Sequence, residues 1–506
     1  MIRVGATGGG EGVMTPHSLE GFLLSSDVGL SDCTRWKQEN IMDKVAASLE
    51  KNFPSHLDDL KSLIRIPSVS FAGFPENEML HCAEGVAAVL RKRGLENVTL
   101  LHVGNAAPYV YGERLRAPGK PTVLLYAHYD VQPPGREELW TSPAFDPVLR
   151  DSPQGQRLYG RGTADDKAGI IMHTSAIASW LEAAGELPVN VKVVIEGEEE
   201  VGSNHLGEFL KVHRKKLDAD VLVLTDTNNF DCGVPAITVG LRGIVALEVE
   251  VRALTKTVHS GMWGGPIPDP VMALSKMIGA LTDDQGRIAV PGVLEQVRPL
   301  SESEIAEFQR IPFDEADFRR QAGLVSGAKL LKDGPSPLAQ LWRLPAMTVT
   351  AIQASSRKQA ANIINDTAWA KVTIRVVPGM DPHKVSQQLE AFLRSKVPWG
   401  LEVTFKGDGG GAAWSANPTG PAFEAADAAL EKGYGVAPYK IGCGGSIGFV
   451  GPFAEALGGA PSILIGVEDP YTNAHGENES VLVADLRKAC TSEAYFFAEL
   501  AERWRK

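Results

Sequence analysis

Residues 121–134 read PTVLLYAHYDVQPP, an apolar run that stops at a histidine, His128. Two later runs stop in the same way: residues 193–195 lead into an acidic cluster that contains Glu199 and Glu200, and residues 221–224 lead to Asp226. Strands buried inside a mostly parallel sheet are near-continuously apolar and are bounded by turn residues. Ligands of open α/β sheets collect beyond the carboxyl ends of such strands. We therefore expect these imidazole and carboxylate groups to face one crevice.

Two further segments supply the same kinds of side chain. Asp165 lies in the glycine-rich turn GRGTADDKAG, directly before a helix predicted over residues 167–184, and His475 lies in TNAHGENES. Together the five segments offer two imidazoles and three carboxylates, a set that suits zinc, with manganese or cobalt as substitutes. Taken alone, a buried histidine is more often a satisfied core residue, and an acidic run is usually a solvated loop. An acidic cluster directly after a buried strand is costly unless a positive charge compensates it, which favours a metal.

The composition is that of an ordinary soluble globular protein, with 44% apolar and 22% charged residues. A formal net charge of −12, without a basic run, argues against a nucleic-acid partner. No stretch reaches the roughly 18 apolar residues of a membrane span, and the first residues do not follow a secretory pattern. Five scattered cysteines without a CxxC pair fit free thiols in a reducing compartment. We therefore expect a cytoplasmic protein without a membrane or nucleic-acid partner.

A chain of 506 residues exceeds what one hydrophobic core normally holds, so we expect two domains. Residues 1–42 have the character of a disordered extension. Helices are predicted at 45–66 and 78–93, and helices then alternate with strands up to residue 239. This pattern is typical of an α/β domain with a mostly parallel sheet flanked by helices.

From residue 240 onward the pattern changes. Apolar and polar residues alternate at 244–251, 348–352 and 371–375, which is typical of half-exposed antiparallel strands. We predict a smaller inserted α+β lid or dimerisation domain over residues 240–405. Residues 406–506 then return to the catalytic domain begun at residues 43–239, which explains how His475 can share a crevice with Asp226.

Seven motifs follow one another along the chain: HYDVQPP, GRGTADDKAG, EGEEEVGS, the aspartate after VLVLT, VHSGMWGG, TIRVVPG and NAHGENE. In this set and order the sequence resembles the family of co-catalytic zinc peptidases and amidohydrolases that includes carnosinase, aminoacylase, acetylornithine deacetylase and succinyl-diaminopimelate desuccinylase. Within that family it looks most like the cytosolic dipeptidases. The resemblance spans residues 45–500 and implies a zinc-peptidase catalytic fold.

The resemblance implies two divalent metal ions per subunit, with zinc as the first expectation. By position, His128 and Asp226 look like ligands of one metal, Glu200 and His475 look like ligands of the other, and Asp165 resembles the carboxylate that bridges both. Each metal then keeps positions open for water or substrate, as a catalytic site requires. The family also implies a cis peptide bond between Asp165 and the residue that follows it.

Glu199 resembles the family's general base, which takes a proton from the attacking water and later delivers it to the departing amine. Asp130 resembles the carboxylate that fixes the imidazole tautomer of His128. His259 resembles a histidine that reaches across a homodimer to stabilise the substrate's oxyanion. Arg375 resembles the arginine that binds the substrate's terminal carboxylate. A loop histidine and an exposed salt bridge are the respective alternatives for the last two residues.

Ser446 lies in a turn that resembles the family's glycine-serine turn beside the substrate. The sequence departs from the family there, because Gly442, Cys443 and Gly448 stand where the dipeptidases place charged residues and a proline. This departure leaves the metal residues untouched and affects recognition of the substrate's end. For Cys443 we expect a small packed side chain, with a thiol close to the metal as the alternative.

These observations predict a metal-dependent dipeptidase or short-peptide hydrolase that uses a two-metal-activated water with a glutamate base. The first alternative is an N-acyl amino acid amidohydrolase, which would use the same metals and base on an acyl-amino-acid substrate. The remote alternative is a non-catalytic metal-binding dimer, which the presence of Glu199 and all five ligand residues disfavours.

Overall fold

The computed structural model describes residues 28–331, 336–407, 410–445 and 447–504, apart from the side chains of residues 28–39 and 303. Residues 1–27 of the predicted extension lie outside this part of the chain, and residues 28–42 are helical, because helix α1 spans Val28–Ile64. The helix predicted from residue 45 therefore begins earlier. The chain divides into two compact units, Met1–Lys44 and Val45–Lys506, and the second unit carries the architecture described below.

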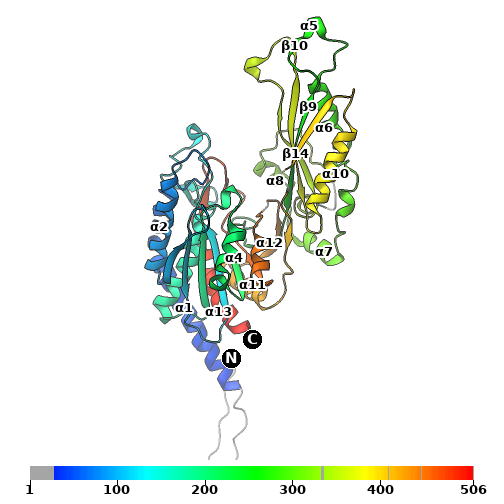
Figure 1. Cartoon of the computed structure of the whole chain (residues 1–506). Coiled ribbons are helices and arrows are strands. Elements are labelled where there is room, and N and C mark those ends of the chain that lie inside the picture. Colours follow the sequence, from blue (N-terminus) through cyan, green and yellow to red (C-terminus); the bar gives the residue numbers. More distant parts are fainter. Residues whose placement is uncertain (1–27, 332–335, 408–409, 446, 505–506) are drawn as a thin grey trace, which may run out of the picture. The chain divides into compact units, whose positions relative to one another are not determined.

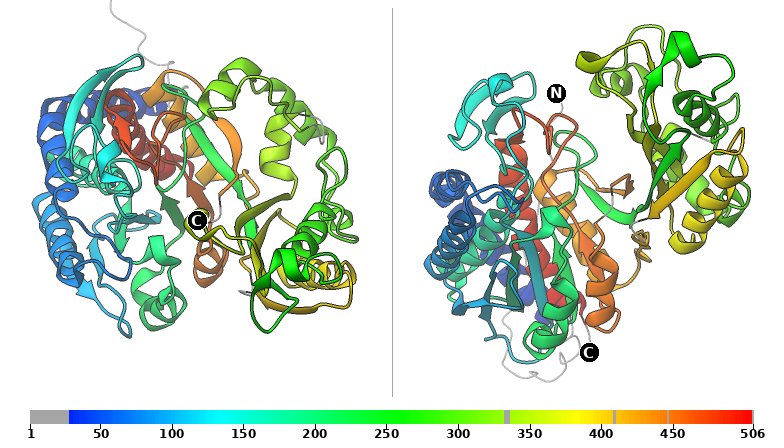
Figure 2. Two further views of the ribbon diagram at one scale, coloured as in Figure 1. Left: turned by 90° about the horizontal axis from the view of Figure 1, so that it is seen from above. Right: turned by 45° about the horizontal axis from the view of Figure 1, so that its top comes forward.

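A nine-stranded mixed sheet forms the larger layer of this unit (Figures 1 and 2). Its central strands β6, β3, β7 and β17 run parallel to one another, whereas β1 and β2 add antiparallel pairs at one edge. The strands are β1 Glu96–Leu101, β2 Tyr109–Arg114, β3 Thr122–His128, β6 Asn190–Glu196, β7 Val221–Leu224, β8 Ala236–Leu241, β15 Trp414–Ser415, β16 Tyr439–Cys443 and β17 Ser462–Leu464. The parallel centre explains the continuous apolar runs, because both of its faces are covered.

Helices flank this sheet, as expected for the α/β class. Helices α3 (Lys167–Ala184), α11 (Pro421–Tyr434) and α13 (Val483–Arg503) pack together, and α2 (Glu76–Lys92) packs on β1 and β2. Helices α4 (Leu206–Leu217) and α12 (Val450–Ala456) share one core cluster with β3 and β7. The helices predicted at 78–93 and 167–184 are confirmed. Among the helices in the described residues, none has the length and apolar character that crossing a membrane requires.

A small three-stranded sheet joins two regions that are far apart in sequence. Its strands are β4 (Val148–Ser152), β5 (Gly155–Tyr159) and β18 (Ser480–Leu482), with β5 in the middle. Ser480 pairs with Tyr159, and the Gly160 amide donates to the Glu479 carbonyl at 3.0 Å. The turn that carries Asp165 and the loop that carries His475 are therefore fastened to each other by backbone hydrogen bonds.

Residues 243–407 contain a separate four-stranded antiparallel sheet in the order β11-β13-β9-β14 (Figure 1). Its strands are β9 Gly243–Arg252, β11 Ala346–Gln353, β13 Thr367–Val376 and β14 Glu402–Gly407, and a short pair joins β10 Val258–His259 to β12 Ile363–Ile364. The alternation predicted for β9 is confirmed, because Val245, Leu247, Val249 and Val251 are all buried in one core. A half-exposed sheet needs cover on one face only, and α6 (Pro270–Gly279) and α10 (Pro382–Ser395) supply it.

The same residues also contain four short helices, α5 Ser260–Trp263, α7 Glu302–Arg310, α8 Glu315–Gln321 and α9 Pro337–Arg343. Helix α9 packs on β16 of the larger sheet. Because Val45–Lys506 forms one compact unit, the division into a catalytic domain and an inserted domain at residues 240 and 405 stays a prediction.

Candidate dinuclear metal centre

Three neighbouring parallel strands deliver polar side chains to one edge of the large sheet. Strand β3 ends at His128, which stands in register with Glu196 at the end of β6. A single helical turn, Glu199–Val201, follows and carries Glu199 and Glu200. Strand β7, on the other side of β3, ends two residues before Asp226. The carboxyl ends of parallel strands share an edge, so these groups meet there.

Asp165 reaches the same edge from the turn before α3. The peptide bond from Asp165 to Asp166 is cis, as the resemblance implies. The start of α3 lies against the end of β7, since a Cβ on Gly169 would stand 2.0 Å from the Thr225 hydroxyl. Only glycine allows this approach, which brings the Asp165 turn next to the residue that precedes Asp226.

The five predicted ligand residues come together as two groups that share Asp165. One group is His128, Asp165 and Asp226, and the other is Asp165, Glu200 and His475; within each, the candidate ligand atoms lie within 4.8 Å of one another. His128 Nε2 is 3.0 Å from Asp165 Oδ1, and His475 Nε2 is 2.9 Å from Asp165 Oδ2. One carboxylate therefore presents an oxygen to each imidazole, as a bridging ligand would.

The electrostatics of these groups fit divalent cations. Burial raises the pKa of Glu200 to about 8, and the negative charge of Asp165 adds to this effect. Burial also raises the pKa of Asp226 well above its usual range, with a further contribution from Glu199. His128 Nε2 is buried and has no hydrogen-bond partner among the described residues, although a carboxylate oxygen lies close by. Clustered carboxylates beside two imidazole nitrogens form a ligand set whose negative charge two cations would neutralise.

Glu199 and Asp130 lie at the edge of the two groups. Burial raises the pKa of Glu199 to about 7, which is suited to a group that exchanges protons near neutral pH. The Asp130 carboxylate accepts hydrogen bonds from the backbone amides of Glu199 and Glu200, at 3.2 and 3.0 Å. His128 Nδ1 is 3.0 Å from the Asp130 carbonyl oxygen and 3.5 Å from its carboxylate. Asp130 therefore holds both the imidazole and the Glu199 turn.

Several neighbours of this cluster were not singled out from the sequence. The side-chain amide of Gln132 donates a hydrogen bond to Glu200 Oε2 at 2.7 Å, and the backbone amide of Gln132 donates one to Glu200 Oε1 at 3.0 Å. Glu479 accepts hydrogen bonds from the backbone amides of Gly162 and Ala164 at 2.8 and 3.0 Å. Both residues stand inside the quoted motifs HYDVQPP and NAHGENE. Their position in those motifs could have drawn attention to them in the sequence. Their hydrogen-bond partners depend on the tertiary structure.

Glu468 is a further carboxylate near the cluster. Burial raises its pKa well above the usual range, and Asp165 adds to this effect, while Asn228 donates a hydrogen bond to its Oε2 at 2.8 Å. Glu468 follows strand β17, which pairs with β7 in parallel. Glu468 therefore follows a parallel strand at the same edge of the sheet, as Asp226 does after β7. Strand β17 is too short to be recognised in the sequence.

The predicted substrate-binding residues do not join the cluster. His259 is exposed and precedes the short helix α5, where its Nδ1 accepts a hydrogen bond from the Gly261 amide at 3.1 Å. Arg375 lies on β13, opposite Ile244 of β9. Neither residue is a member of the two groups that share Asp165. Ser446 lies outside the described residues.

Arg242 lies beside the glycine-rich turn at residues 442–445 and was also missed. Its backbone amide donates to the Cys443 carbonyl at 3.3 Å, and its Nε donates to the Gly444 carbonyl at 3.1 Å. Burial lowers the pKa of Arg242, and the positive charge of Arg375 lowers it further. Arg242 therefore connects this turn to the arginine predicted to bind the substrate's carboxylate.

Comparison with known proteins gives the family. Residues 124–499 match the model of peptidase family M20/M25/M40. The chain is 33% identical over 463 residues to a cysteinylglycine-S-conjugate dipeptidase of Corynebacterium striatum, covering 90% of this chain and 98% of that protein. It is 28% identical to the human Beta-Ala-His dipeptidase, covering 91% and 93% of the two chains.

Solved structures agree with these relatives. The structure of the dipeptidase Dug1p from Saccharomyces cerevisiae has a TM-score of 0.79 at 26% identity, covering 91% of this chain and 98% of that chain. Human carnosine dipeptidase 1 also has a TM-score of 0.79, at 27% identity, with coverage of 91% and 99%. The fold class predicted from the sequence is therefore confirmed. The chain belongs to peptidase family M20/M25/M40, in its dipeptidase-like part, and is a hydrolase that acts on peptide bonds.

Proposed function

We propose that the protein is a metal-dependent dipeptidase that binds two divalent cations. Zinc is the first candidate, and the cations would bind at the two groups of side chains that share Asp165. The observation that carries this proposal is the shared carboxylate, with one oxygen near the imidazole of each group. His128 and Asp226 would hold one cation, and Glu200 and His475 would hold the other. The dipeptidase names of the relatives support a dipeptide as substrate.

When bound, the two metals polarise the scissile carbonyl and lower the pKa of the attacking water. Glu199, which stands next to Glu200 at the edge of the two groups, accepts the proton of that water and transfers it to the departing amine. Asp130 keeps this base in place through the Glu199 backbone amide, and Gln132 orients the Glu200 carboxylate. The chain's own residues thus supply proton transfer and rigidity.

The substrate's terminal carboxylate is assigned to Arg375, and Ser446, outside the described residues, stays a predicted substrate-binding residue. This assignment is supported by the second guanidinium of Arg242, which lies close to Arg375 and is fixed to the Gly444 carbonyl. A planar guanidinium can bind a carboxylate through two parallel hydrogen bonds. An acyl amino acid carries the same terminal carboxylate, so the amidohydrolase alternative differs only at the other end of the substrate.

We also assign a homodimer, formed through residues 240–405, in which His259 serves the partner subunit's site. Two large apolar side chains beside His259 support this assignment: Met262 is 77% exposed and Trp263 is 52% exposed. Exposed apolar side chains that cluster on a turn are typical of an interaction surface. A cytoplasmic location is consistent with the free thiols of Cys82, Cys232, Cys443 and Cys490.

The test is turnover of a substrate panel by the purified protein, after chelation and again after zinc or manganese is returned. The panel contains dipeptides, tripeptides, N-acetyl amino acids and N-succinyl amino acids. Metal-dependent release of amino acids from dipeptides would support the proposal. Release from the acylated amino acids alone would replace it by the amidohydrolase. Turnover that is unchanged by chelation would remove the metal from the reaction.

A further inference from the structure

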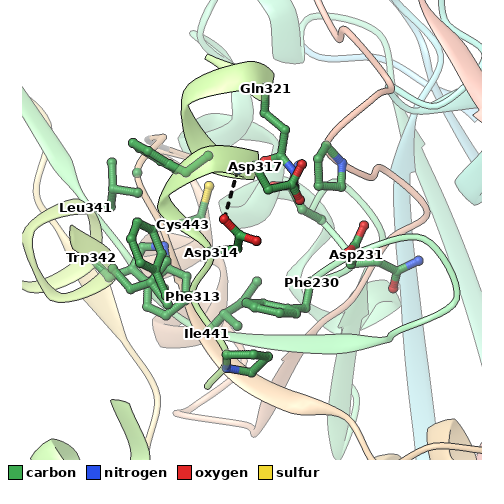
Figure 3. A pocket seen from close by; sticks show the side chains of 18 residues that line it. Phe230, Asp231, Phe313, Asp314, Asp317, Gln321, Leu341, Trp342, Ile441 and Cys443 are labelled. Atoms are coloured by element: carbon green, nitrogen blue, oxygen red, sulfur yellow. Dashed lines mark hydrogen bonds between the residues drawn. The ribbon is translucent and has the colours of Figure 1, made fainter. Parts of the chain in front are cut away.

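A cavity of about 410 Å³ lies between the loops after β7, β16 and β17 and the segment that contains α8 and α9 (Figure 3). This volume is within the range of small-molecule sites. The aromatic side chains that line it are Phe230, Phe313, Phe318 and Trp342, accompanied by Leu338, Leu341 and Ile441. The glycine at position 442 lets the wall close, because a Cβ there would stand 2.5 Å from the Trp342 Cβ.

The charged residues that line the cavity are all acidic. They are Asp231, Asp314 and Asp317, and the described residues of the lining include neither lysine nor arginine. Asp314 caps helix α8 by accepting hydrogen bonds from the backbone amides of residues 316 and 317, one of which is drawn in Figure 3. Asp317 forms an ion pair with Arg320, which offsets its charge, so Asp231 and Asp314 supply the negative charge of the lining. The cavity therefore combines an apolar wall with two acidic groups, which would accept apolar side chains and repel carboxylates.

The position of the cavity ties it to the catalytic cluster. Its lining includes Asn228, two residues beyond Asp226, and the Asn228 amide donates to Glu468 at 2.8 Å. The lining also includes Cys443 and Gly444, and the Gly444 carbonyl accepts a hydrogen bond from Arg242. The lining of the cavity thus includes one residue bound to a carboxylate near the acidic cluster and another bound to Arg242.

We propose that this cavity binds the side chain of the C-terminal residue of the dipeptide and selects large apolar side chains over acidic ones. The inference rests on the proposed dipeptidase function, which places the terminal carboxylate at Arg375. A dipeptide whose terminal carboxylate is held at the arginines and whose amide lies at the acidic cluster has this cavity beside it, because lining residues bind Arg242 and Glu468. Phe313 and Trp342 are the specificity-determining residues, because they supply aromatic surface from outside the large sheet.

The experiment compares kcat/KM for Ala-Phe, Phe-Ala, Ala-Gly and Ala-Glu in the parent protein and in two variants, Phe313→Ala and Trp342→Ala. We expect the parent to favour Ala-Phe over Ala-Gly and Ala-Glu, and each variant to lower the Ala-Phe to Ala-Gly ratio by about tenfold. Trp399→Ala is the matched control, because Trp399 is 56% exposed and lies outside the lining. Asp231→Asn should raise kcat/KM for Ala-Glu several-fold.

The ratio separates specificity from general damage, since a merely structural effect would lower kcat/KM for Ala-Phe and Ala-Gly equally. Equal losses in both variants, a parent preference for Ala-Glu, or sensitivity of Phe-Ala in place of Ala-Phe would overturn the assignment of the cavity while leaving the dipeptidase intact. Failure of the parent to cleave any dipeptide, while it cleaves acylated amino acids, would overturn the proposed function and this inference with it.

Discussion

The guanidinium Nη1 of Arg161 lies 2.8 Å from the carboxylate Oε2 of Glu479, and both side chains are buried. Glu479 also accepts from the Gly162 amide, and Arg161 donates to the His475 carbonyl at 3.2 Å. This pair therefore fastens the Asp165 turn to the His475 loop, so that the two candidate metal groups keep a common geometry.

Removing this guanidinium should destabilise the protein and weaken metal binding together. Arg161→Met leaves the Glu479 carboxylate buried without its partner, so we expect a loss of about 3–5 kcal/mol in the free energy of unfolding. Urea unfolding measures this loss. The control is Arg136→Met, whose exposed pair with Glu477 at 2.8 Å should contribute less than about 1 kcal/mol. Equal effects of the two variants would contradict the role of the buried pair.

The number of bound metal ions should show whether Asp165 is a ligand of both metals. The protein should bind two divalent ions per chain after dialysis, Asp226→Asn should keep one of them, and Asp165→Asn should weaken both, because Asp165 belongs to both groups. Elemental analysis with zinc titration measures the stoichiometry. Glu477→Gln is the control, since this residue lies two positions from His475 but pairs with Arg136. Retention of two tight sites in Asp165→Asn would exclude a bridging carboxylate.

Removing the proposed base should separate chemistry from metal binding. Glu199→Ala should keep two metal ions and lower kcat by about 10²–10⁴-fold, because the attacking water then lacks its proton acceptor. Steady-state kinetics and metal analysis on the same preparation measure both quantities. Glu208→Ala, on the exposed side of α4, should leave kcat unchanged. Wild-type turnover in Glu199→Ala would remove this residue from the mechanism.

Mixing two inactive variants should test whether His259 acts across a dimer. His259→Ala and Glu199→Ala should each be inactive as homodimers. A mixed dimer pairs one chain that keeps Glu199 with a partner that keeps His259, so one complete site should reappear. Co-refolding the two variants and assaying dipeptide turnover measures this recovery. Failure to recover activity in demonstrated mixed dimers, or a monomeric mass in solution, would contradict the exchange of His259.

A buried histidine far from the predicted ligands should make stability depend on pH. His56 is 1% exposed and its pKa is lowered to about 4, first by burial and then by the positive charge of Arg93, with Asp59, Lys92 and Glu182 acting on it as well. As the pH falls, His56 is therefore protonated near pH 6.5 in the unfolded chain but only near pH 4 in the folded chain. The contribution of neutral His56 to the free energy of unfolding is fully present above pH 6.5. It is lost as the pH falls from 6.5 to about 4.

His56→Leu should remove this part of the acid sensitivity, which amounts to about 3 kcal/mol between the two limits. The measurement is urea unfolding at pH 7 and at pH 4.5 in the parent and the variant. His81→Leu, at an exposed position on α2, is the matched control. An unchanged difference between the two pH values in His56→Leu would show that His56 does not carry the effect.

The five residues that come together around Asp165 could be singled out from the sequence because their signal is local. An apolar strand that stops at an imidazole or a carboxylate is visible at His128 and Asp226, and a glycine-rich turn before a helix is visible at Asp165. Helix α3 and the alternation in β9 were likewise predicted. The spacing of apolar residues along an element reflects which of its faces are buried, so it can be read from the sequence. Glu468 was missed because strand β17 has only three residues.

The sequence by itself determined the kinds of chemical group, their order along the chain and the strands that end in them, because burial and hydrophobic period act on neighbouring residues. The tertiary structure decided which oxygen faces which nitrogen at Asp165, and which backbone amides Glu479 accepts from. It also created the cavity between Asn228 and Trp342, whose linings come from segments more than a hundred residues apart. Contacts between distant segments depend on the packing of whole elements, and no local pattern encodes them.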